Sequence, residues 1–281
     1  MDIRPQDLPE LRAELAKQYQ NPDVVQRWWK SPRPEVEARA VADACTEVAE
    51  SSDLFHVARS MAELARAASG TLESFALLVD DLPSPNGLMV FDGPAIGEVT
   101  YCDGPIAPIH GLQWQAVSGS LFVTPLLGMP RASPTALMPE MRIAFNVPTD
   151  GLRKAFPEPG ANPALRPRLL SFLVTVFLLM RQPLAAESSL ECNHLPEAPL
   201  HPASHIPASV RVIELRRPKH SGSDAGESGR TYAHRWITRG HWRQQWYPSR
   251  EVHRPVWIAP HVKGPEDAPM IGGEKVYAWK R

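Results

Sequence analysis

Near the C-terminal end of this chain, four side chains have the chemistry to cleave a phosphodiester without a metal. His241 and His261 could act as general base and general acid near neutral pH. Arg243 and Lys263 could stabilise the negative charge of the transition state. Tyr247 is a further candidate acid. One hypothesis is therefore a metal-independent endoribonuclease, such as a toxin-like enzyme.

The same stretch is rich in aromatic residues. Five of the eight tryptophans and four of the ten histidines lie after residue 230. Arginine neutralises phosphate, and tryptophan stacks on unpaired bases. The function we favour is therefore binding of nucleic acid, with RNA favoured, or of another polyanion. The predicted binding residues are Arg235, Arg239, Trp242, Trp246, Arg254 and Trp257.

A third interpretation assigns these side chains to the fold. The tryptophans would then be core residues, the arginines would stack on them, and the histidines would be half-buried hydrogen-bonding groups. In that case the role of the segment is structural, or it binds a protein partner. The sequence alone leaves the question of an enzyme open.

Alternation along an extended chain predicts which side chains share a face. His234 and Trp236 should face one way, and Ala233, Arg235 and Ile237 the other. Gly240 predicts a bulge or bend that leaves the phase beyond it open. After it, one face should carry His241, Arg243 and Gln245, and the other Trp242, Gln244 and Trp246. If a strand bearing His261 and Lys263 lies beside the first face, the four candidate catalytic side chains could converge.

Charge is segregated along the chain. Residues 230–281 contain ten Lys or Arg residues against four Asp or Glu residues, a balance of +6, whereas the remainder carries −7. This segregation predicts an anionic partner for the C-terminal part. The alternative is that the basic segment docks on the acidic body of its own chain.

Several function classes lack support. No histidine, cysteine or carboxylate spacing is typical of a metal site, so we predict no metal, and no nucleotide-binding or hydrolase motif predicts a cofactor. The three cysteines, Cys45, Cys102 and Cys192, form no CxxC pair and fit a reducing cytosol. The N-terminus lacks an apolar signal segment. We therefore expect a soluble cytoplasmic protein.

The C-terminal block also resembles a known group of sequences. Its residues are Trp236, Gly240–Arg243, Gln245–Ser249, His253–Arg254, Trp257–Ile258, Pro260–His261 and Lys263–Pro265. The block is similar to the C-terminal signature of uncharacterised proteins from high-GC Gram-positive bacteria, some of them linked to phages or plasmids. The resemblance implies a bacterial protein of a mobile element, and it implies no activity.

The elements that must position this segment begin with helices. Pro9 opens one helix, a stripe of apolar residues from Pro34 to Val48 predicts a second, and Leu54–Ala68 predicts a third. Short strands should follow, separated by Gly- and Pro-bearing turns: Phe75–Val79, Leu88–Phe91, Gly111–Val117, Leu121–Leu127 and Arg142–Val147.

An apolar helix comes next, at about Ala164–Gln182. Its apolar run Leu169–Met180 is shorter than the roughly 20 residues that span a bilayer, so we predict a core helix and no membrane partner, with Leu173 and Phe177 buried. The last strands should be Val210–Leu215, Tyr232–Arg239, Val256–Val262 and Lys275–Trp279.

These elements predict an α+β fold, with N-terminal helices followed by a mainly antiparallel sheet and a basic C-terminal β module. The C-terminal strands would either join the main sheet or pack as a small second unit. The predicted domains are an α+β body at 1–182, a Pro-rich connector at 183–207 and the module at 208–281.

Overall fold

A computed structural model describes most of the chain in two units, Met1–Arg216 and Arg217–Arg281. The predicted α+β class is confirmed, because N-terminal helices precede a mainly antiparallel sheet. The first unit is called the body. The described residues are 3–29, 31–73, 77, 79–94, 98–100, 106–117, 119–128, 137–139, 143–146, 165–182, 186–192, 209–215, 233–265 and 268–269.

Three helices open the body. A short 3-10 turn, η1 (Pro5–Asp7), leads into α1 (Leu8–Tyr19), which is followed by α2 (Pro22–Gln26) and α3 (Glu35–Ser51). Asn21 begins α2, because its side-chain oxygen accepts a hydrogen bond from the Asp23 amide at 3.0 Å. The buried residues of α3 recur at helical spacing from Ala38 to Ala49, so one stripe of the helix faces the core. The predicted stripe was wrong over its first part, because Pro34 and Val36 are exposed.

The sheet of the body is mixed. Its order is β6-β5-β4-β2-β1-β9-β8, with β3 paired to β4 and β7 to β5. β1 is parallel to both β2 and β9, and the other pairs are antiparallel. The strands are β1 (Asp53–Val57), β2 (Asn86–Phe91), β3 (Glu98–Thr100), β4 (Ile106–Val117), β5 (Ser120–Gly128), β6 (Leu137–Pro139), β7 (Ile143–Asn146), β8 (Ala186–Cys192) and β9 (Ser209–Leu215).

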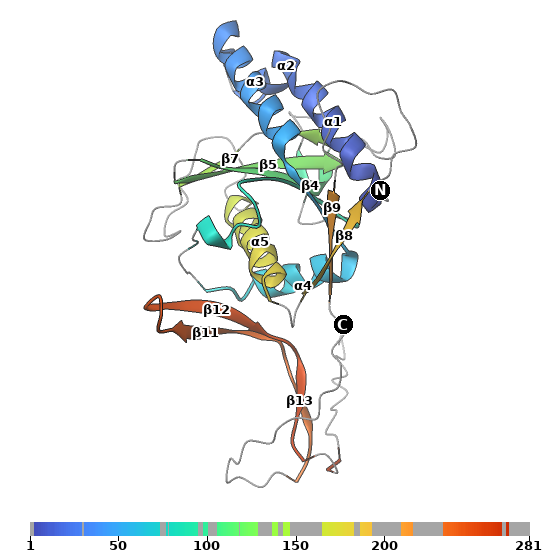
Figure 1. The fold of residues 1–281 in the computed structure, drawn as a ribbon, viewed down its shortest axis with the longest axis vertical. Helices are drawn as coiled ribbons and strands as arrows, with labels where there is room; N and C mark the ends of the chain where they lie inside the picture. Colours follow the sequence, from blue (N-terminus) through green and yellow to red (C-terminus); the bar gives the residue numbers. More distant parts are fainter. Residues whose placement is uncertain are drawn as a thin grey trace, which may run out of the picture. The chain divides into compact units, whose positions relative to one another are not determined.

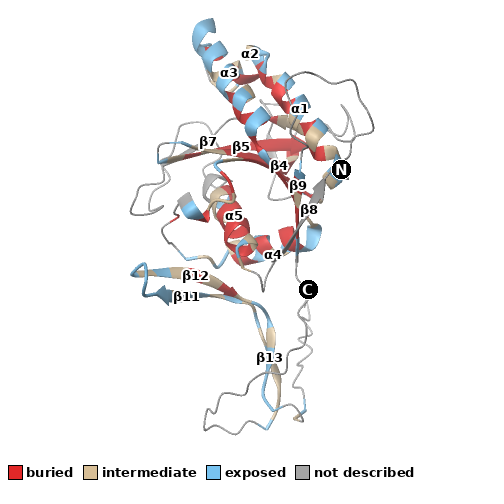
Figure 2. Ribbon diagram, viewed as in Figure 1, coloured by how far each residue is buried: buried red, intermediate tan, exposed pale blue. Residues whose placement is uncertain are grey.

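Helices cover both faces of this sheet (Figure 1). The first face packs on α1–α3, and its core includes Leu54, Leu88 and Val90. The second face packs on α4 (Arg59–Ser69) and α5 (Leu165–Met180). Phe91 of β2 contacts Phe172 of α5, with ring centroids 5.2 Å apart. The buried positions of the body therefore lie along the sheet and the inner sides of the helices (Figure 2).

Trp114 is the centre of the second face. Its ring lies against Gly87, its partner across β2 and β4, and a Cβ on that glycine would sit 2.1 Å from the indole. The indole also contacts Phe55 and Phe177, with centroids at 5.3 and 5.0 Å, and its Nε1 donates to the Ser84 carbonyl at 3.0 Å. This one side chain therefore joins β1, β2, β4 and α5.

The helix α5 is a core helix, as predicted. Leu173 and Phe177 are both 0% exposed. No helix among the described residues is long and apolar enough to cross a membrane.

The structure corrects two predicted elements. The sequence predicted one helix over Leu54–Ala68, but Asp53–Val57 is strand β1 and the helix α4 begins at Arg59. β1 lies between two parallel neighbours and is buried on both faces, so its apolar run carries no alternation that would mark it as a strand. The predicted irregular connector 183–207 contains β8, which pairs with β9 in the main sheet.

One predicted boundary differs from the structure, and two predicted strands lie wholly or mostly outside the described residues. The predicted module began at residue 208, whereas its first strand, β9, pairs with β1 inside the body. Most of the predicted strand Phe75–Val79 is not among the described residues, and Val79 belongs to the 3-10 turn η2 (Val79–Asp81). The predicted strand Lys275–Trp279 also lies outside them.

His110 occupies a β-bulge. Ile109 pairs with Leu127 and Gly111 with Leu126, so His110 is an extra residue with no partner in β5. It is 5% exposed, and its Nδ1 has no hydrogen-bond partner within the described part of the chain. Burial lowers the pKa of His110 below its usual value, because a charged imidazole would lose its hydration there.

The first prediction concerns Gly87. Gly87→Ala forces a methyl group into the space of the Trp114 indole, and we expect a loss of about 1–3 kcal/mol in the free energy of unfolding, measured with urea. Gly70→Ala is the matched control, because that glycine follows α4 with a helical backbone and its Cβ would meet only Ala67 O at 3.9 Å. Equal losses in both variants would show that the Trp114 contact does not limit stability.

The second prediction concerns pH. As the pH falls below about 6.5, an unfolded chain protonates His110 while the folded chain does not, so the unfolding free energy should fall. This loss should continue until the pH reaches the lowered pKa of the folded state. His110→Phe should flatten the fall, as read from urea midpoints between pH 8 and 5. The exposed His241 gives the control His241→Gln, which should leave the slope unchanged.

Candidate functional site

The described part of the second unit is a long β-hairpin. β10 (Trp236–Thr238) pairs with β13 (His261–Lys263), and β11 (His241–Tyr247) pairs with β12 (Val252–Ile258), both antiparallel. Thr238 faces His261 and His241 faces Ile258, so each strand advances by three residues between the two ladders. The register therefore continues through the break, and no bulge is inserted at Gly240. We call residues 236–263 the β-ribbon.

The β-ribbon has two distinct faces. Beyond the break, the tryptophan face carries Trp242, Gln244 and Trp246, opposite Trp257, Pro255 and His253. The arginine face carries His241, Arg243 and Gln245, opposite Ile258, Val256 and Arg254. Directly opposed residues of an antiparallel pair share a face, so this is the division that alternation predicted for residues 241–246.

Gly240 marks a bend that Trp257 fills. A Cβ on Gly240 would lie 2.4 Å from the Trp257 ring and 3.1 Å from the Pro260 ring. Trp257 is 8% exposed and meets Trp242 edge to face, with centroids 5.3 Å apart. Only glycine leaves room for the indole here, so the bend and the Trp242–Trp257 pair depend on each other.

The turn of the hairpin contains a strained residue. Pro248–Glu251 connect β11 to β12, and the Arg250 amide donates to the Tyr247 carbonyl at 3.1 Å. Glu251 has φ 52°, a left-handed conformation that favours glycine. It is also the one acidic side chain among residues 233–265, which hold six Arg or Lys residues.

The four candidate catalytic residues are divided between two ladders. His261 and Lys263 pair with Thr238 and Trp236 in β10, whereas His241 and Arg243 pair with β12. Residues 239–240 and 259–260 interrupt the strands between these ladders, so the two histidines lie on different sides of the bend. Each imidazole Nδ1 instead lies by a carbonyl two residues earlier, at 3.1 Å from Arg239 O for His241 and 3.0 Å from Ala259 O for His261.

The candidate cation Arg243 and the further candidate acid Tyr247 both lie on the surface. Arg243 Nη2 donates to Gln245 Oε1 at 2.8 Å along the arginine face. Tyr247 is 40% exposed at the end of β11, opposite Val252. The arrangement therefore offers a cationic surface and no enclosed reaction centre.

The predicted binding residues divide into structural and exposed ones. Arg235 is held in place, since its Nε donates to the Ala268 carbonyl at 2.8 Å and its amide to the Pro269 carbonyl at 2.8 Å. Trp257 is buried and Trp242 packs on it. Arg239 and Trp246 are exposed, and Arg254 is half-buried. The surface available to a partner therefore comes from Arg239, Arg243, Trp246 and Arg254.

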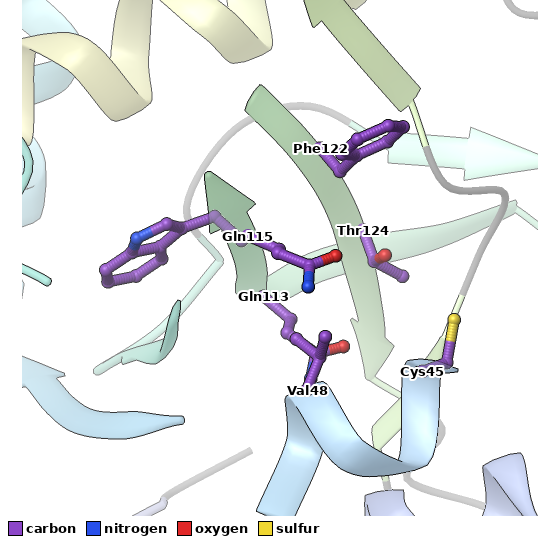
Figure 3. A pocket seen from close by; sticks show the side chains of 7 residues that line it. Cys45, Val48, Gln113, Gln115, Phe122 and Thr124 are labelled. Carbon is purple, nitrogen blue, oxygen red and sulfur yellow. The ribbon is translucent and has the colours of Figure 1, made fainter. Parts of the chain in front are cut away.

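A polar cavity in the body was not indicated by the sequence (Figure 3). It lies between α3 and strands β4 and β5, and side chains from all three line it. Tyr19 Oη donates to Gln113 Oε1 at 2.9 Å, while the buried Gln113 Nε2 has no partner within the described ranges. The cavity volume of about 10 Å³ has room for about one water molecule and none for a substrate.

The described residues also contain no group of three histidine, cysteine or acidic side chains placed to hold a metal ion. The polar cavity and the β-ribbon are thus different in kind. The first is a packing feature, and the second is an open surface.

Comparisons with known proteins give a structural likeness and no family. No protein-family model matches the chain, and no curated protein matches it. Among solved structures the chain is similar to AcrVA2, with 14% sequence identity and a TM-score of 0.46, over 92% of this chain and 86% of that one. A likeness at this level carries no functional argument. The resemblance of the C-terminal block to uncharacterised bacterial proteins stays a prediction.

The third prediction concerns the turn. Glu251→Gly removes the Cβ from a left-handed residue, so the hairpin should gain up to about 1 kcal/mol. Hydrogen exchange of the β11 and β12 amides should slow accordingly. Glu251→Ala keeps the Cβ and removes the same charge, so it should give no such protection. Equal protection in both variants would assign the effect to charge instead of backbone strain.

Proposed function

We propose that the β-ribbon binds nucleic acid. The observation that carries this proposal is a two-stranded surface with six basic side chains against one acidic side chain in residues 233–265. Within the described residues neither ladder of the ribbon pairs with a third strand. Contacts between basic side chains and phosphates supply a large share of the affinity of proteins for nucleic acid.

The exposed arginines have suitable spacing for an extended polyanion. Arg239 and Arg243 are both exposed; Arg239 lies between β10 and β11 next to the bend, and Arg243 lies within β11. Arg254 lies across from Gln245 on the same face as Arg243. A ligand that follows the ribbon could therefore contact these guanidinium groups in succession, which favours a long flexible anion over a small one.

Binding is better supported than cleavage. A metal-independent ribonuclease needs a base, an acid and a cation around one phosphate. In the β-ribbon, His241 and Arg243 belong to the β11–β12 ladder, whereas His261 and Lys263 belong to the β10–β13 ladder on the other side of the bend. His241 is exposed and His261 is half-buried. Neither histidine is therefore enclosed in a centre from which water is excluded.

The fourth prediction concerns salt dependence. Affinity for a labelled RNA oligonucleotide, read by fluorescence anisotropy, should fall linearly on a log–log plot as salt rises. The double change Arg239→Gln and Arg243→Gln should weaken binding at low salt and reduce the slope by about two.

Arg66→Gln supplies the matched control, because Arg66 is an exposed arginine near the end of α4 in the body. It removes one positive charge outside the ribbon and should leave the slope as it is. Salt-independent affinity, or equal losses in the control, would refute binding through the ribbon.

A further inference from the structure

The two aromatic pairs of the tryptophan face, Trp242–Trp257 and Trp246–His253, have different physical roles. Trp257 is buried and fills the space at Gly240, so the Trp242–Trp257 pair holds the bend. Trp246 is 43% exposed, and its ring neighbour is the exposed His253. An indole this exposed leaves much apolar area in water, which contributes little to folding. Its place is better explained by a ligand.

Trp246 belongs to a small group of exposed rings at the tip of the β-ribbon. His253 lies directly opposite it, is exposed, and its ring centroid is 4.8 Å from that of the indole. Tyr247, 40% exposed, is the next residue and faces the other way at the strand end. Aromatic surface and cationic surface therefore meet at one end of the hairpin, close to Arg254 and Arg250.

We propose that the β-ribbon takes single-stranded nucleic acid, with one base stacked on the Trp246 indole beside His253, and with the strand passing over the tip of the hairpin so that its phosphates reach the arginine face. This rests on the nucleic-acid binding proposed above and specifies the ligand. Every base has a π-face, so stacking on Trp246 requires no particular sequence. The contact is a binding contact and includes no chemical step.

The choice of a single strand follows from where base faces are accessible. In a duplex each base is covered by its neighbours, and only base edges are open in the grooves. To stack on Trp246, a duplex would have to unstack a step, which costs a few kcal/mol. In a single strand the base faces are already available. An exposed indole therefore discriminates between the two forms, whereas the arginines do not.

Three probes separate stacking from charge: a labelled oligouridylate of about twelve nucleotides, a duplex RNA of equal length, and heparin, which is anionic but has no bases. Trp246→Ala should weaken oligouridylate binding roughly 5- to 100-fold. Heparin binding should change less than about twofold, since no charge is removed. Trp246→Phe should restore most of the loss, while Trp246→Leu, apolar but without a π-face, should not.

Ile237→Ala is the matched control, because Ile237 is 64% exposed on the other arm of the ribbon and contributes no ring. It should leave all three affinities unchanged. Hydrogen exchange of the β11–β12 amides checks that each variant keeps the hairpin.

The outcomes distinguish this inference from the function on which it rests. If the wild-type protein binds none of the three probes, nucleic-acid binding itself fails. If it binds heparin and duplex but not oligouridylate, or if Trp246→Ala weakens heparin as much as oligouridylate, the polyanion surface stands and stacking is overturned. If Trp246→Leu binds oligouridylate as well as Trp246→Phe does, the contact is apolar packing and the proposal also fails.

Discussion

The contact between Trp114 and Gly87 is the constraint on which the body depends. The indole occupies the place of a Cβ on β2, and it packs on Phe55 of β1 and Phe177 of α5. β1 joins β2 and β9 in the parallel part of the sheet, whereas β4 begins the antiparallel part. The Trp114 side chain therefore contacts both parts of the sheet and the covering helix, and the Ser84 carbonyl accepts its one polar hydrogen.

The β-ribbon contains the same kind of contact, an indole packed on a glycine, with a different result. Trp257 lies over Gly240 as Trp114 lies over Gly87, and in both places the missing Cβ lets an indole approach the backbone. In the body, helices cover both faces of the sheet, so the contact adds to a core. In the ribbon the described strands pair only with each other, so the contact fixes a bend and leaves Trp246, Arg239 and Arg243 exposed. The proposed binding surface and the support of the fold therefore use different tryptophans.

Patterns along the sequence predicted the features that depend on residues close together in the chain. The core helix α5 and the two faces of residues 241–246 both follow from the pattern of residues along the chain. The predictions that failed concern elements whose structure depends on strands far away in the sequence. β1 was merged into a helix because its buried run has no alternation, and β8 was missed because only its pairing with β9 makes it a strand. The separation of His241 from His261 likewise depends on β13 pairing with β10, which no local spacing reveals.

The chain has a net charge of only −1, but its positive charge is concentrated in residues 230–281. This segregation would let the C-terminal part attract a polyanion. A nearly neutral chain exerts little long-range pull on a polyanion, and beyond about 8 Å salt screens what remains at physiological ionic strength. Attraction must therefore come from charges within a short distance of the ligand. A two-stranded ribbon is thin, so one extended strand of the proposed ligand could contact both its guanidinium groups and the indole at its tip. The acidic excess of the rest of the sequence would repel a polyanion, which agrees with a binding surface proposed on the ribbon alone.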